Sequence, residues 1–445
     1  MNVLLLDDKN CFLDFALRCM SYGHYVRVCN AYVHGQTDKR LRVPTKVGDG
    51  LVEKIPNEDW QKHAKWADLI LLADNTRWLP ELDALKKKGY PVFAPSVESA
   101  RLEHERGLGQ ALMKKCGLNV MPYEMFTDYH KAEEYVLATN ERYVSKPDGD
   151  VDKALSYVSK SPADMVFMLR RWNHTQNKGR RFMLQGFVPG VEFAVNGWMG
   201  KRGFSKWIEE SFEHKKLMND DYGPNTGEMG TAIRYVDHSA LAEEVLLPLE
   251  RELMKMGHTG SVDVSVIVDE DGNPRPLEFT SRLGWPAFNI CQPLHPEPCD
   301  WMVDLLDGND SFKPSTQHAV GVVMAIPDFP YSHHTLKETA GVPIYGLDNE
   351  NEWRNQISPC ELMLGECPAM VDGEVCDKKL MVSVGDYLCV ATGLGDTVSK
   401  AKDQAYEVVK SMEVPNNLIV RTDIGDIEEE LEVLQGHGFA KEWVF

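Results

Sequence analysis

The chain of 445 residues lacks several features that would mark whole classes of protein. Basic residues are not in excess: 48 lysines and arginines stand against 68 aspartates and glutamates, a formal charge of −20. Because such a surface repels a polyanion, nucleic acid is not expected as the main partner. The ten cysteines include no C-x-x-C pair, which argues against a disulfide framework or a structural zinc site and indicates reduced thiols.

A long hydrophobic run is also missing. The apolar run Val3 to Leu6 is followed at once by Asp7 and Asp8, so the amino terminus reads as neither a signal peptide nor a membrane span. With 43% hydrophobic residues the chain can bury a large core, and its length predicts two to four domains. We therefore expect a cytoplasmic protein that has no membrane partner.

The first hundred residues alternate between strand and helix patterns. Cys11 to Met20 has helical spacing, and short β-rich runs surround it and recur later, at Val3–Leu6, Tyr25–Val28, Leu69–Leu72 and Val92–Ala94. Such alternation predicts a parallel sheet with helices on both faces. We expect an α/β, Rossmann-like domain over residues 1–102.

Strands that carry polar loops dominate the rest of the chain. The runs Ser261–Val268 and Pro274–Phe279 flank a D-G turn and predict a hairpin. Near the carboxyl end, Lys400–Lys410 has the pattern of an amphipathic helix. We expect an α+β domain over 103–312, with a small lid subdomain at about 120–190, and a carboxyl-terminal α+β domain over 313–445.

Two stretches in the middle third place polar side chains at strand ends. Lys146 follows a predicted strand and precedes a glycine-containing turn, a placement that directs an ammonium group toward a phosphate. Further along, Gln185 and Phe187 can offer amide and backbone groups to an adenine edge, and Glu192 can accept from ribose hydroxyls. A surface lysine and a plain P-G hairpin turn are the alternative interpretations.

The stretch P-L-E-F-T-S-R-L-G closes another predicted strand. Glu278 lies at its end and Arg282 follows four residues later. A carboxylate for magnesium beside a guanidinium for a phosphoryl group is what phosphoryl transfer requires. An ion pair between the two side chains explains the spacing as well.

In combination and in this order, these stretches resemble the ATP-grasp ligases. That family binds ATP between two α+β subdomains and carries a strand-end lysine, a hinge, a ribose-binding acid and a late E-x-N-x-R strand. Here S-K-P-D-G supplies the lysine, Q-G-F-V-P-G-V-E-F the hinge and acid, and L-E-F-T-S-R the late strand. Arg106 stands where the family has an earlier phosphate-binding lysine.

A narrower resemblance, to the phosphoribosylamine–glycine ligases, covers nearly the whole chain. That family carries D-H-K-R and then D-x-G-P-N-T-G-G-M-G, and this chain reads E-H-K-K-L-M-N-D-D-Y-G-P-N-T-G-E-M-G over 213–230. L-C-V-A-T-G-L-G-D-T and R-T-D-I-G near the carboxyl end are similar too. The resemblance implies that ATP converts an amino acid carboxylate to an acyl phosphate, which an amine then displaces.

The resemblance also implies roles for individual residues. Near the transferred phosphoryl group it places Arg282, His214, Lys215 and Lys216. ATP is expected to contact Arg106, Lys146, Lys153, Gln185, Phe187 and Glu192. The loop that closes over the reacting carboxylate contributes Asp221, Asn225, Thr226 and Gly227. Magnesium or manganese is expected on Glu278 and Thr280, and Asp263 is either a further ligand or a solvated strand acid.

The chain departs from the family at several of these positions. Thr280 replaces the metal-binding asparagine, acids enter the loop after Lys146, and Glu228 replaces the third glycine of G-P-N-T-G-G-M-G. R-F-G-D-P-E becomes R-L-G-W-P-A, with Trp285 and Ala287, and G-G-R-V becomes G-D-Y-L, with Asp386.

The amino-terminal domain departs most. The family opens with a strand and G-x-G-G-R-E-H-A, whose glycines and arginine hold the phosphate of phosphoribosylamine at a helix N-terminus. Here Asp7 and Asp8 follow the first strand, where they would repel a phosphate and attract a cation. Alternatively, these aspartates cap the following helix.

We therefore expect an ATP-grasp carboxylate–amine ligase that acts on a small amino acid and an amine, as a monomer or homodimer. The amine acceptor is expected to differ from phosphoribosylamine. A true phosphoribosylamine–glycine ligase of purine biosynthesis and a catalytically inert ATP-binding regulatory module remain the alternatives.

Overall fold

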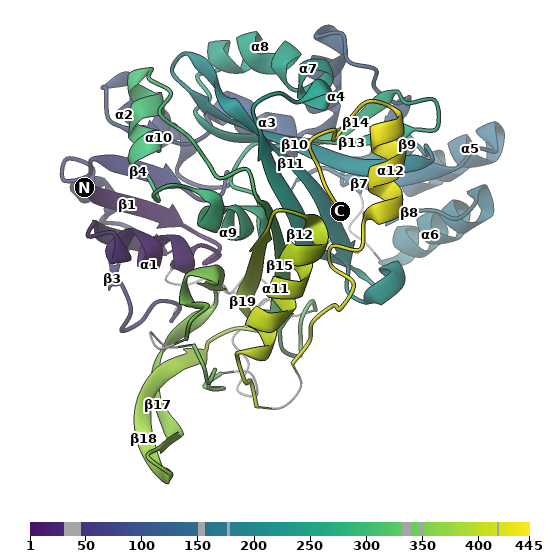
Figure 1. Ribbon diagram of the computed structural model, residues 1–445. Helices are drawn as coiled ribbons and strands as arrows, with labels where there is room; N and C mark the ends of the chain where they lie inside the picture. Colours follow the sequence, from purple (N-terminus) through teal and green to yellow (C-terminus); the bar gives the residue numbers. More distant parts are fainter. Residues whose placement is uncertain (31–45, 150–155, 176–178, 332–339, 348–350, 416–417) are drawn as a thin grey trace.

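The computed structural model describes residues 1–30, 46–149, 156–175, 179–331, 340–347, 351–415 and 418–445 (Figure 1). Its strands form a parallel five-stranded sheet, an antiparallel eight-stranded sheet, an antiparallel four-stranded sheet and a two-stranded hairpin. Helices pack on these sheets, which confirms the expected mixture of α/β and α+β structure. None of the helices within the described ranges is long and apolar enough to cross a membrane.

The amino-terminal sheet is parallel throughout and has the order β3-β2-β1-β4-β5. Its strands are β1 (Asn2–Asp7), β2 (Tyr25–Asn30), β3 (Glu53–Lys54), β4 (Leu69–Leu72) and β5 (Val92–Phe93). Three helices accompany them, α1 (Leu13–Ser21), α2 (Leu79–Lys87) and α3 (Val97–His104). Alternate residues of β1 belong to different apolar clusters, Leu5 to one and Leu4 to the other, so β1 is buried on both faces.

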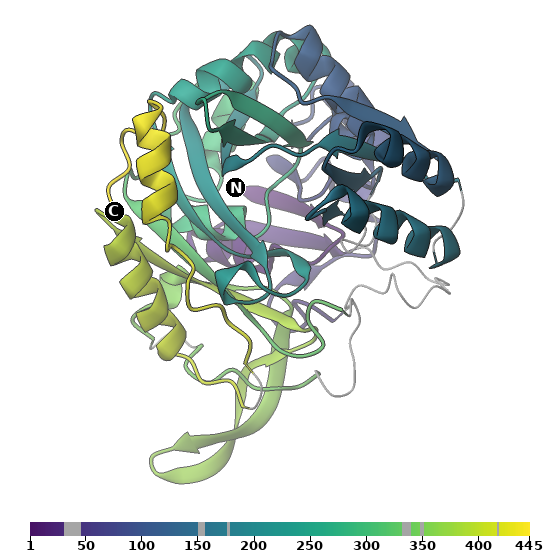
Figure 2. The same ribbon diagram turned by 90° about the vertical axis from the view of Figure 1, so that its right-hand side faces the viewer.

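The four-stranded sheet is a smaller antiparallel layer with the order β6-β9-β7-β8. Its strands are β6 (Tyr123–Phe126), β7 (Tyr143–Pro147), β8 (Tyr157–Val158) and β9 (Phe182–Gly186). The helices α5 (Tyr129–Thr139) and α6 (Pro162–Thr175) pack together and share an apolar cluster with β7 and β9. This unit lies at the periphery of the molecule in both views (Figures 1 and 2).

The eight-stranded sheet is antiparallel throughout, with the order β14-β13-β10-β11-β12-β15-β19-β16. Its strands are β10 (Gly190–Gly200), β11 (Gly203–Lys216), β12 (Asn225–Val236), β13 (Gly260–Asp269), β14 (Pro274–Thr280), β15 (His318–Ala325), β16 (Ile357–Pro359) and β19 (Tyr387–Gly395). The sheet therefore continues from the expected ATP-grasp region into the carboxyl-terminal region.

Residue alternation gives this sheet one apolar and one polar face. On β13 the valines at 262, 264, 266 and 268 enter the main apolar cluster, while Ser261, Asp263 and Ser265 point the other way. The apolar cluster also includes side chains of six α-helices: α3, α4 (Arg106–Lys115), α7 (Ala240–Val245), α8 (Glu250–Lys255), α11 (Val398–Lys410) and α12 (Glu428–Gly436). The polar face is left free to form a site.

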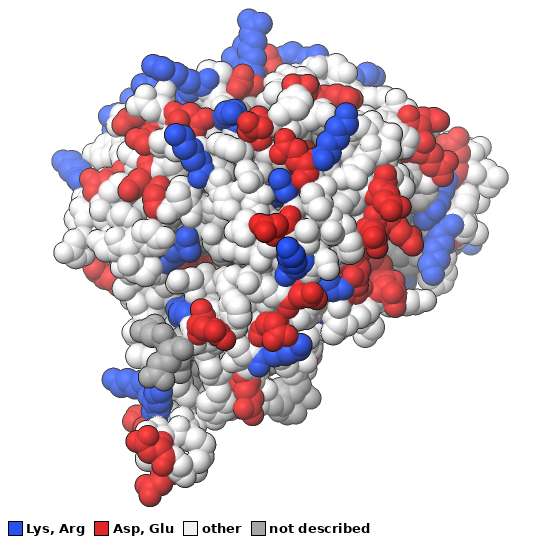
Figure 3. Space-filling view, in the orientation of Figure 1, with Lys and Arg blue, Asp and Glu red and all other residues white. Residues whose placement is uncertain are grey.

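The remaining elements lie around these layers. Helices α9 (Ala287–Cys291) and α10 (Asp300–Asp307) contribute to the apolar cluster beside the parallel sheet. Strands β17 (Leu362–Val371) and β18 (Glu374–Ser383) form a hairpin that projects from the body in both views (Figures 1 and 2). The acidic first turn of α12 is visible as a cluster of carboxylates on the surface (Figure 3).

The glycine-rich stretch 221–230 differs from the loop that its composition predicted. Only its first part is a turn, because β12 begins at Asn225 and continues through Gly227 and Gly230. Gly230 has φ of 154°, and a Cβ there would lie 2.4 Å from the carbonyl oxygen of Gly321 on β15. A glycine at this position permits close approach of the neighbouring strand, which composition alone cannot distinguish from loop flexibility.

The contact between α11 and the sheet yields a stability prediction. A Cβ at Gly393 would lie 2.1 Å from the carbonyl oxygen of Ala401, so Gly393→Ala must separate α11 from β19. We expect a loss of about 1–3 kcal/mol in the free energy of unfolding, measured in urea. Gly436→Ala is the control, because no atom lies within 4 Å of its Cβ position. Equal stability of Gly393→Ala and the parent chain would contradict this packing.

Candidate active site

Strand register assembles a row of polar side chains across the polar face of the eight-stranded sheet. Thr280 pairs with Asp263, which pairs with Asn196, which pairs with Glu209, which pairs with Tyr235. Directly paired residues in a sheet point to the same side. The row therefore runs over β14, β13, β10, β11 and β12 and forms the floor of a site.

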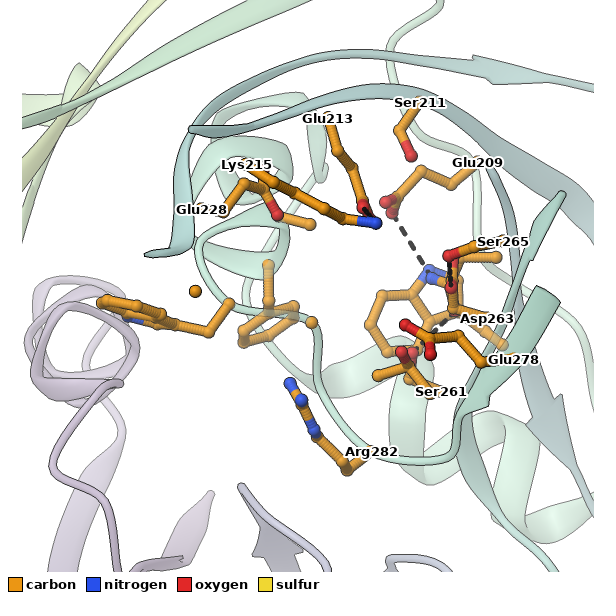
Figure 4. Close-up of a pocket in the computed structure, with 18 residues that line it drawn as sticks. Glu209, Ser211, Glu213, Lys215, Glu228, Ser261, Asp263, Ser265, Glu278 and Arg282 are labelled. Carbon is orange, nitrogen blue, oxygen red and sulfur yellow. Dashed lines mark hydrogen bonds and ion pairs between the residues drawn. The ribbon is translucent and has the colours of Figure 1, made fainter. Parts of the chain in front are cut away.

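A cavity of about 120 Å³ lies on this floor. Its walls carry five carboxylates, from Glu209, Glu213, Glu228, Asp263 and Glu278. Only two cationic side chains, Lys215 and Arg282, line it among the described residues. In Figure 4, Glu213, Lys215 and Glu228 lie on one side of the cavity, Asp263 and Glu278 lie on another, and Arg282 points in from below. The site therefore has a surplus of negative charge.

The excess charge raises the pKa of several of these acids. Burial, followed by the charges of Glu213 and Glu209, raises the pKa of Asp263 well above its usual value. Burial also raises the pKa of Glu209 to about 7, although Tyr235 donates to its carboxylate at 2.9 Å. Cations brought in by ligands would relieve this repulsion.

One wall of the cavity has the donor set of a hard divalent cation. Glu278 and Thr280 lie two residues apart on β14, and their partners across the strand pair are Ser265 and Asp263. Oxygen atoms from carboxylates and hydroxyls are the ligands that Mg²⁺ prefers. The residues thus fit the predicted metal site, and Asp263 faces the cavity instead of bulk solvent.

Two of the predicted phosphate-binding cations meet at Glu278. Arg106 donates to the Glu278 carboxylate, and the Lys146 ammonium lies 3.7 Å from the same carboxylate. Burial lowers the pKa of Lys146 to about 8, against the opposing effect of Glu278. The strand-end lysine, the helix-start arginine and the acid of the proposed metal site therefore converge.

Lys215 is held between acids from two strands. Its ammonium contacts Glu192 on β10 and lies 2.9 Å from Glu213 on its own strand. Burial alone would lower its pKa, but Glu192, Glu213 and Glu278 together raise it well above the usual value. Lys215 is therefore a fixed positive charge between the predicted ribose acid and the cavity.

The neighbours of Lys215 point away from the cavity, because side chains alternate along β11. The Nε2 atom of His214 accepts from the backbone N–H of Gly425 at 3.3 Å, and burial lowers its pKa to about 4. The backbone carbonyl of Lys216 accepts from Arg421 at 2.9 Å. Of the four residues expected near the phosphoryl group, the structure brings only Lys215 and Arg282 into the cavity.

The turn between β11 and β12 is tied to the R-T-D-I-G stretch near the carboxyl end. Arg421, which is 2% exposed, donates to Asp221 at 3.0 Å and to Asp423 at 2.6 Å. Asn219 exchanges hydrogen bonds with Thr422, at 2.6 Å and 3.1 Å. Asp221 thus anchors the turn outside the cavity. Direct hydrogen bonds connect this turn to the R-T-D-I-G stretch, so the two motifs form one structural unit.

Of the other predicted substrate-binding residues on β12, two hydrogen-bond to backbone carbonyls and one lines the cavity. Asn225 donates to the carbonyl of Ser156 at 3.1 Å, and Thr226 donates to the carbonyl of Lys215 at 3.0 Å. Gly227 lines the cavity, where a Cβ would lie 3.3 Å from the indole ring of Trp285. Only Gly227 of the three reaches the site directly.

The predicted adenine-binding hinge has one open donor. Gln185 is 1% exposed, and its Nε2 finds no hydrogen-bond partner among the described residues. The backbone N–H of Phe187 is already bound to the carbonyl of Arg142, whose guanidinium lies 3.3 Å from the Phe187 ring centroid. Lys153 lies outside the described residues.

Asp7 and Asp8 lie at the carboxyl edge of the parallel sheet, but both have protein partners. Asp7 accepts from the backbone N–H groups of Cys11 and Phe12, at 3.2 Å and 2.9 Å. Asp8 accepts from Thr76 at 2.8 Å. Asp7 therefore holds the turn just before α1, which begins at Leu13.

Sequence reasoning missed the acids of β11. The run W-I-E-E-S-F-E-H-K has polar residues on both faces, so simple alternation does not separate Glu209 and Glu213 from Glu210. Glu210 points to the opposite face, where it accepts from Ser239 and Trp443. The signal in the sequence was the spacing of two residues between Glu213 and Lys215, which places both side chains on the same face of a strand.

Comparison with known proteins places this site in a class. Residues 106–287 match the family model of the phosphoribosylglycinamide synthetase ATP-grasp (A) domain. A phosphoribosylamine–glycine ligase of Vibrio parahaemolyticus is 25% identical over 362 residues, which are 77% of this chain and 79% of that protein. One from Neisseria meningitidis serogroup A is 28% identical over 363 residues, 78% and 80% of the two chains.

Solved structures show the same fold. The crystal structure of phosphoribosylamine–glycine ligase from Thermotoga maritima has a TM-score of 0.68 at 20% identity, covering 95% of this chain and 100% of that one. The ADP complex of an N5-carboxyaminoimidazole ribonucleotide synthetase has a TM-score of 0.58 at 13% identity, covering 92% and 96%. The fold is thus ATP-grasp, and the chain is an ATP-grasp ligase that forms C–N bonds. Within that class it resembles phosphoribosylamine–glycine ligase.

The burial of Asp7 yields a pH-dependent stability prediction. Burial raises its pKa from 3.8 to about 7, so the folded chain keeps a proton there that the unfolded chain loses at lower pH. This contribution to stability is present below about pH 4 and is lost as the pH rises through 7. Asp7→Asn removes the titration. Relative to the parent chain, we expect the variant to gain about 1–3 kcal/mol between pH 5 and pH 8, by urea unfolding. The same difference at both pH values would contradict it.

Proposed function

We propose that the chain activates an amino acid with ATP as an acyl phosphate and joins it to an amine that brings no phosphate to the β1–α1 turn. The carboxylate oxygen attacks the γ-phosphorus and ADP leaves. The amine then attacks the acyl carbon, and phosphate leaves with the former carboxylate oxygen while the amine loses a proton. The proposed acceptor is therefore not a phosphoribosylamine that places its phosphate at this turn, as the resemblance implies.

The ATP half of this proposal rests on the convergence at Glu278. Lys146 and Arg106 supply positive charge where phosphates would lie, and the buried Gln185 amide offers a donor for an adenine edge. When bound, Mg²⁺ on Glu278, Thr280 and Asp263 would neutralise phosphate charge and polarise the transferred group. Arg106 and Lys146 then exchange their contact with Glu278 for contacts with phosphate oxygens.

The cavity residues supply the second half. Lys215 and Arg282 lie on opposite sides of the space in which the carboxylate must meet the phosphoryl group (Figure 4). Two fixed cations can stabilise the charge that develops on the transferred oxygens. Enclosure by the walls of the cavity limits water, which would hydrolyse an acyl phosphate.

The altered acceptor rests on the single observation that Asp7 binds the N–H groups of Cys11 and Phe12, in the turn just before α1. Free N–H groups at the start of a helix after a strand are the usual binding site for a phosphate. Here the carboxylate of Asp7 already accepts from Cys11 and Phe12, and Asp8 is buried beside it. A phosphate at this turn would have to displace Asp7 and face two acids at short range.

The cysteines are consistent with the cytoplasmic location that we propose. The buried thiols of Cys19 and Cys299 lie 4.0 Å apart without a disulfide. Burial raises the pKa of Cys19 well above its usual value, which keeps the thiol protonated and unreactive. The substrates that we propose are small molecules.

The activation step is tested by trapping the acyl phosphate with hydroxylamine, a small neutral nucleophile that converts it to a hydroxamate. With ATP, Mg²⁺ and a panel of amino acids, we expect hydroxamate and ADP in equal amounts. Glu278→Gln keeps the shape but removes the charge that holds the metal, so hydroxamate should fall about 10²–10³-fold.

Glu270→Gln is the matched control, because Glu270 is an exposed acid on the β13–β14 turn. It should retain the parental rate. Near-parental hydroxamate formation by Glu278→Gln would show that the metal assignment is wrong. Nucleotide binding without hydroxamate for any amino acid would instead favour the inert ATP-binding module.

The acceptor is tested by supplying phosphoribosylamine and phosphate-free alkylamines at equal concentration. We expect ADP release to be at least tenfold faster with an alkylamine. Efficient use of phosphoribosylamine that Asp7→Asn and Asp8→Ala leave undiminished would establish a phosphoribosylamine–glycine ligase of purine biosynthesis instead.

A further inference from the structure

Two residues at which the sequence departs from the resembling family line the cavity, and a third packs against one of them. They are Glu228 on β12, Trp285 after β14 and Tyr387 at the start of β19. The ring centroids of Trp285 and Tyr387 are 3.7 Å apart. Trp285 also packs against Gly227, the residue before Glu228. Three segments that are far apart in the sequence thus come together.

Each of these side chains has a buried polar atom without a protein partner. Among the described residues, neither Oε1 of Glu228, Nε1 of Trp285 nor the hydroxyl of Tyr387 makes a hydrogen bond. Glu228 is 5% exposed and Tyr387 is 3% exposed. Leaving a buried polar group unpaired is costly, so these three atoms are available to hydrogen-bond a bound ligand.

The wall faces the amino-terminal sheet and not the metal site. Trp285 packs in the apolar cluster that includes Cys11, which follows β1, and Cys11 also lies close enough to Tyr387 to affect its pKa. Asp263 and Glu278 lie on a different side of the cavity from Glu228 (Figure 4). A group bound at this wall therefore reaches the reacting carboxylate from the side of the β1–α1 turn.

We propose that Glu228, Trp285 and Tyr387 form the acceptor subsite and that they select an alkylammonium compound. A buried carboxylate next to two aromatic rings is the chemical combination that binds an alkylammonium cation, through charge and through the faces of the rings. The other acids of the cavity already have partners: Glu213 pairs with Lys215, and Glu209 accepts from Tyr235. Glu228 is thus the acid that an incoming cation can pair with.

This assignment rests on the proposed ligase function but is tested by binding instead of turnover. The probe is 1,4-diaminobutane, measured by calorimetry with and without MgADP, and 1-butanol is the neutral control. We expect Glu228→Gln to weaken diaminobutane binding at least tenfold and Tyr387→Phe to weaken it less. Butanol should not bind measurably to the parent chain or to either variant.

Glu210→Gln is the matched control, because Glu210 is a buried acid of β11 on the opposite face of the sheet. It should bind diaminobutane as the parent chain does, and thermal unfolding of each variant establishes that it is folded. Glu228→Gly, which restores the family's residue, should lose binding as Glu228→Gln does.

Two results would overturn the subsite. One is equal binding of diaminobutane by the parent chain and Glu228→Gln, or no binding by a folded parent chain. The other is a loss of glycine affinity in Glu228→Gln with diaminobutane binding unchanged, which would assign the wall to the amino acid. Failure to bind MgADP would count against the ligase proposal alone, since the measurements without nucleotide still decide the subsite.

Discussion

The surplus of carboxylates on the polar face of the eight-stranded sheet is the constraint on which the site depends. Among the described residues, five acids and two bases line a cavity of about 120 Å³, and the cations Arg106 and Lys146 contact one of these acids, Glu278. Burial is the main cause of the raised pKa values of Asp263 and Glu209, and the charges of neighbouring acids add to it. The arrangement is stable with bound cations, which is the condition that a metal-nucleotide complex and an ammonium acceptor would meet.

Strand register turns this constraint into geometry. Because side chains alternate along β13, the strand that places valines in the core also places Ser261, Asp263 and Ser265 over the cavity. The pairing of Asp263 with Thr280 and of Ser265 with Glu278 fixes the spacing of the metal-site oxygens. A register slip of one residue would move all of them to the apolar face. Because β19 belongs to the same sheet as these strands, the packing of α11 against Gly393 also supports the site from a distance.

The sequence was sufficient for the parts of the site that single residues in ordered motifs define. The strand-end positions of Lys146 and Glu278 and the parallel sheet around β1 followed from local patterns. The side on which His214 lies did not, because the resemblance grouped His214, Lys215 and Lys216 together, whereas side chains alternate along β11. The acids Glu209 and Glu213 were missed because their strand is polar on both faces.

Contacts between segments that are far apart in the chain could not be predicted from the sequence either. Nothing in R-T-D-I-G indicates that Arg421 binds Asp221, although each motif was noted separately. Nor does the sequence reveal that Glu228, Trp285 and Tyr387 meet, because each looked like an isolated departure. Their proximity depends on how β12, β14 and β19 are placed in and beside one sheet. Through tertiary contacts of this kind, substitutions that are scattered along the sequence can together change which ligand one site binds.

The central claim is that a substrate carboxylate is activated by phosphorylation within this acidic cavity. Following ¹⁸O from a labelled amino acid carboxylate into the products tests it most directly. The account predicts that one labelled oxygen appears in the released phosphate for each amide formed with an alkylamine. Amide formation with unlabelled phosphate, in which the second labelled oxygen leaves in AMP or in water, would contradict it.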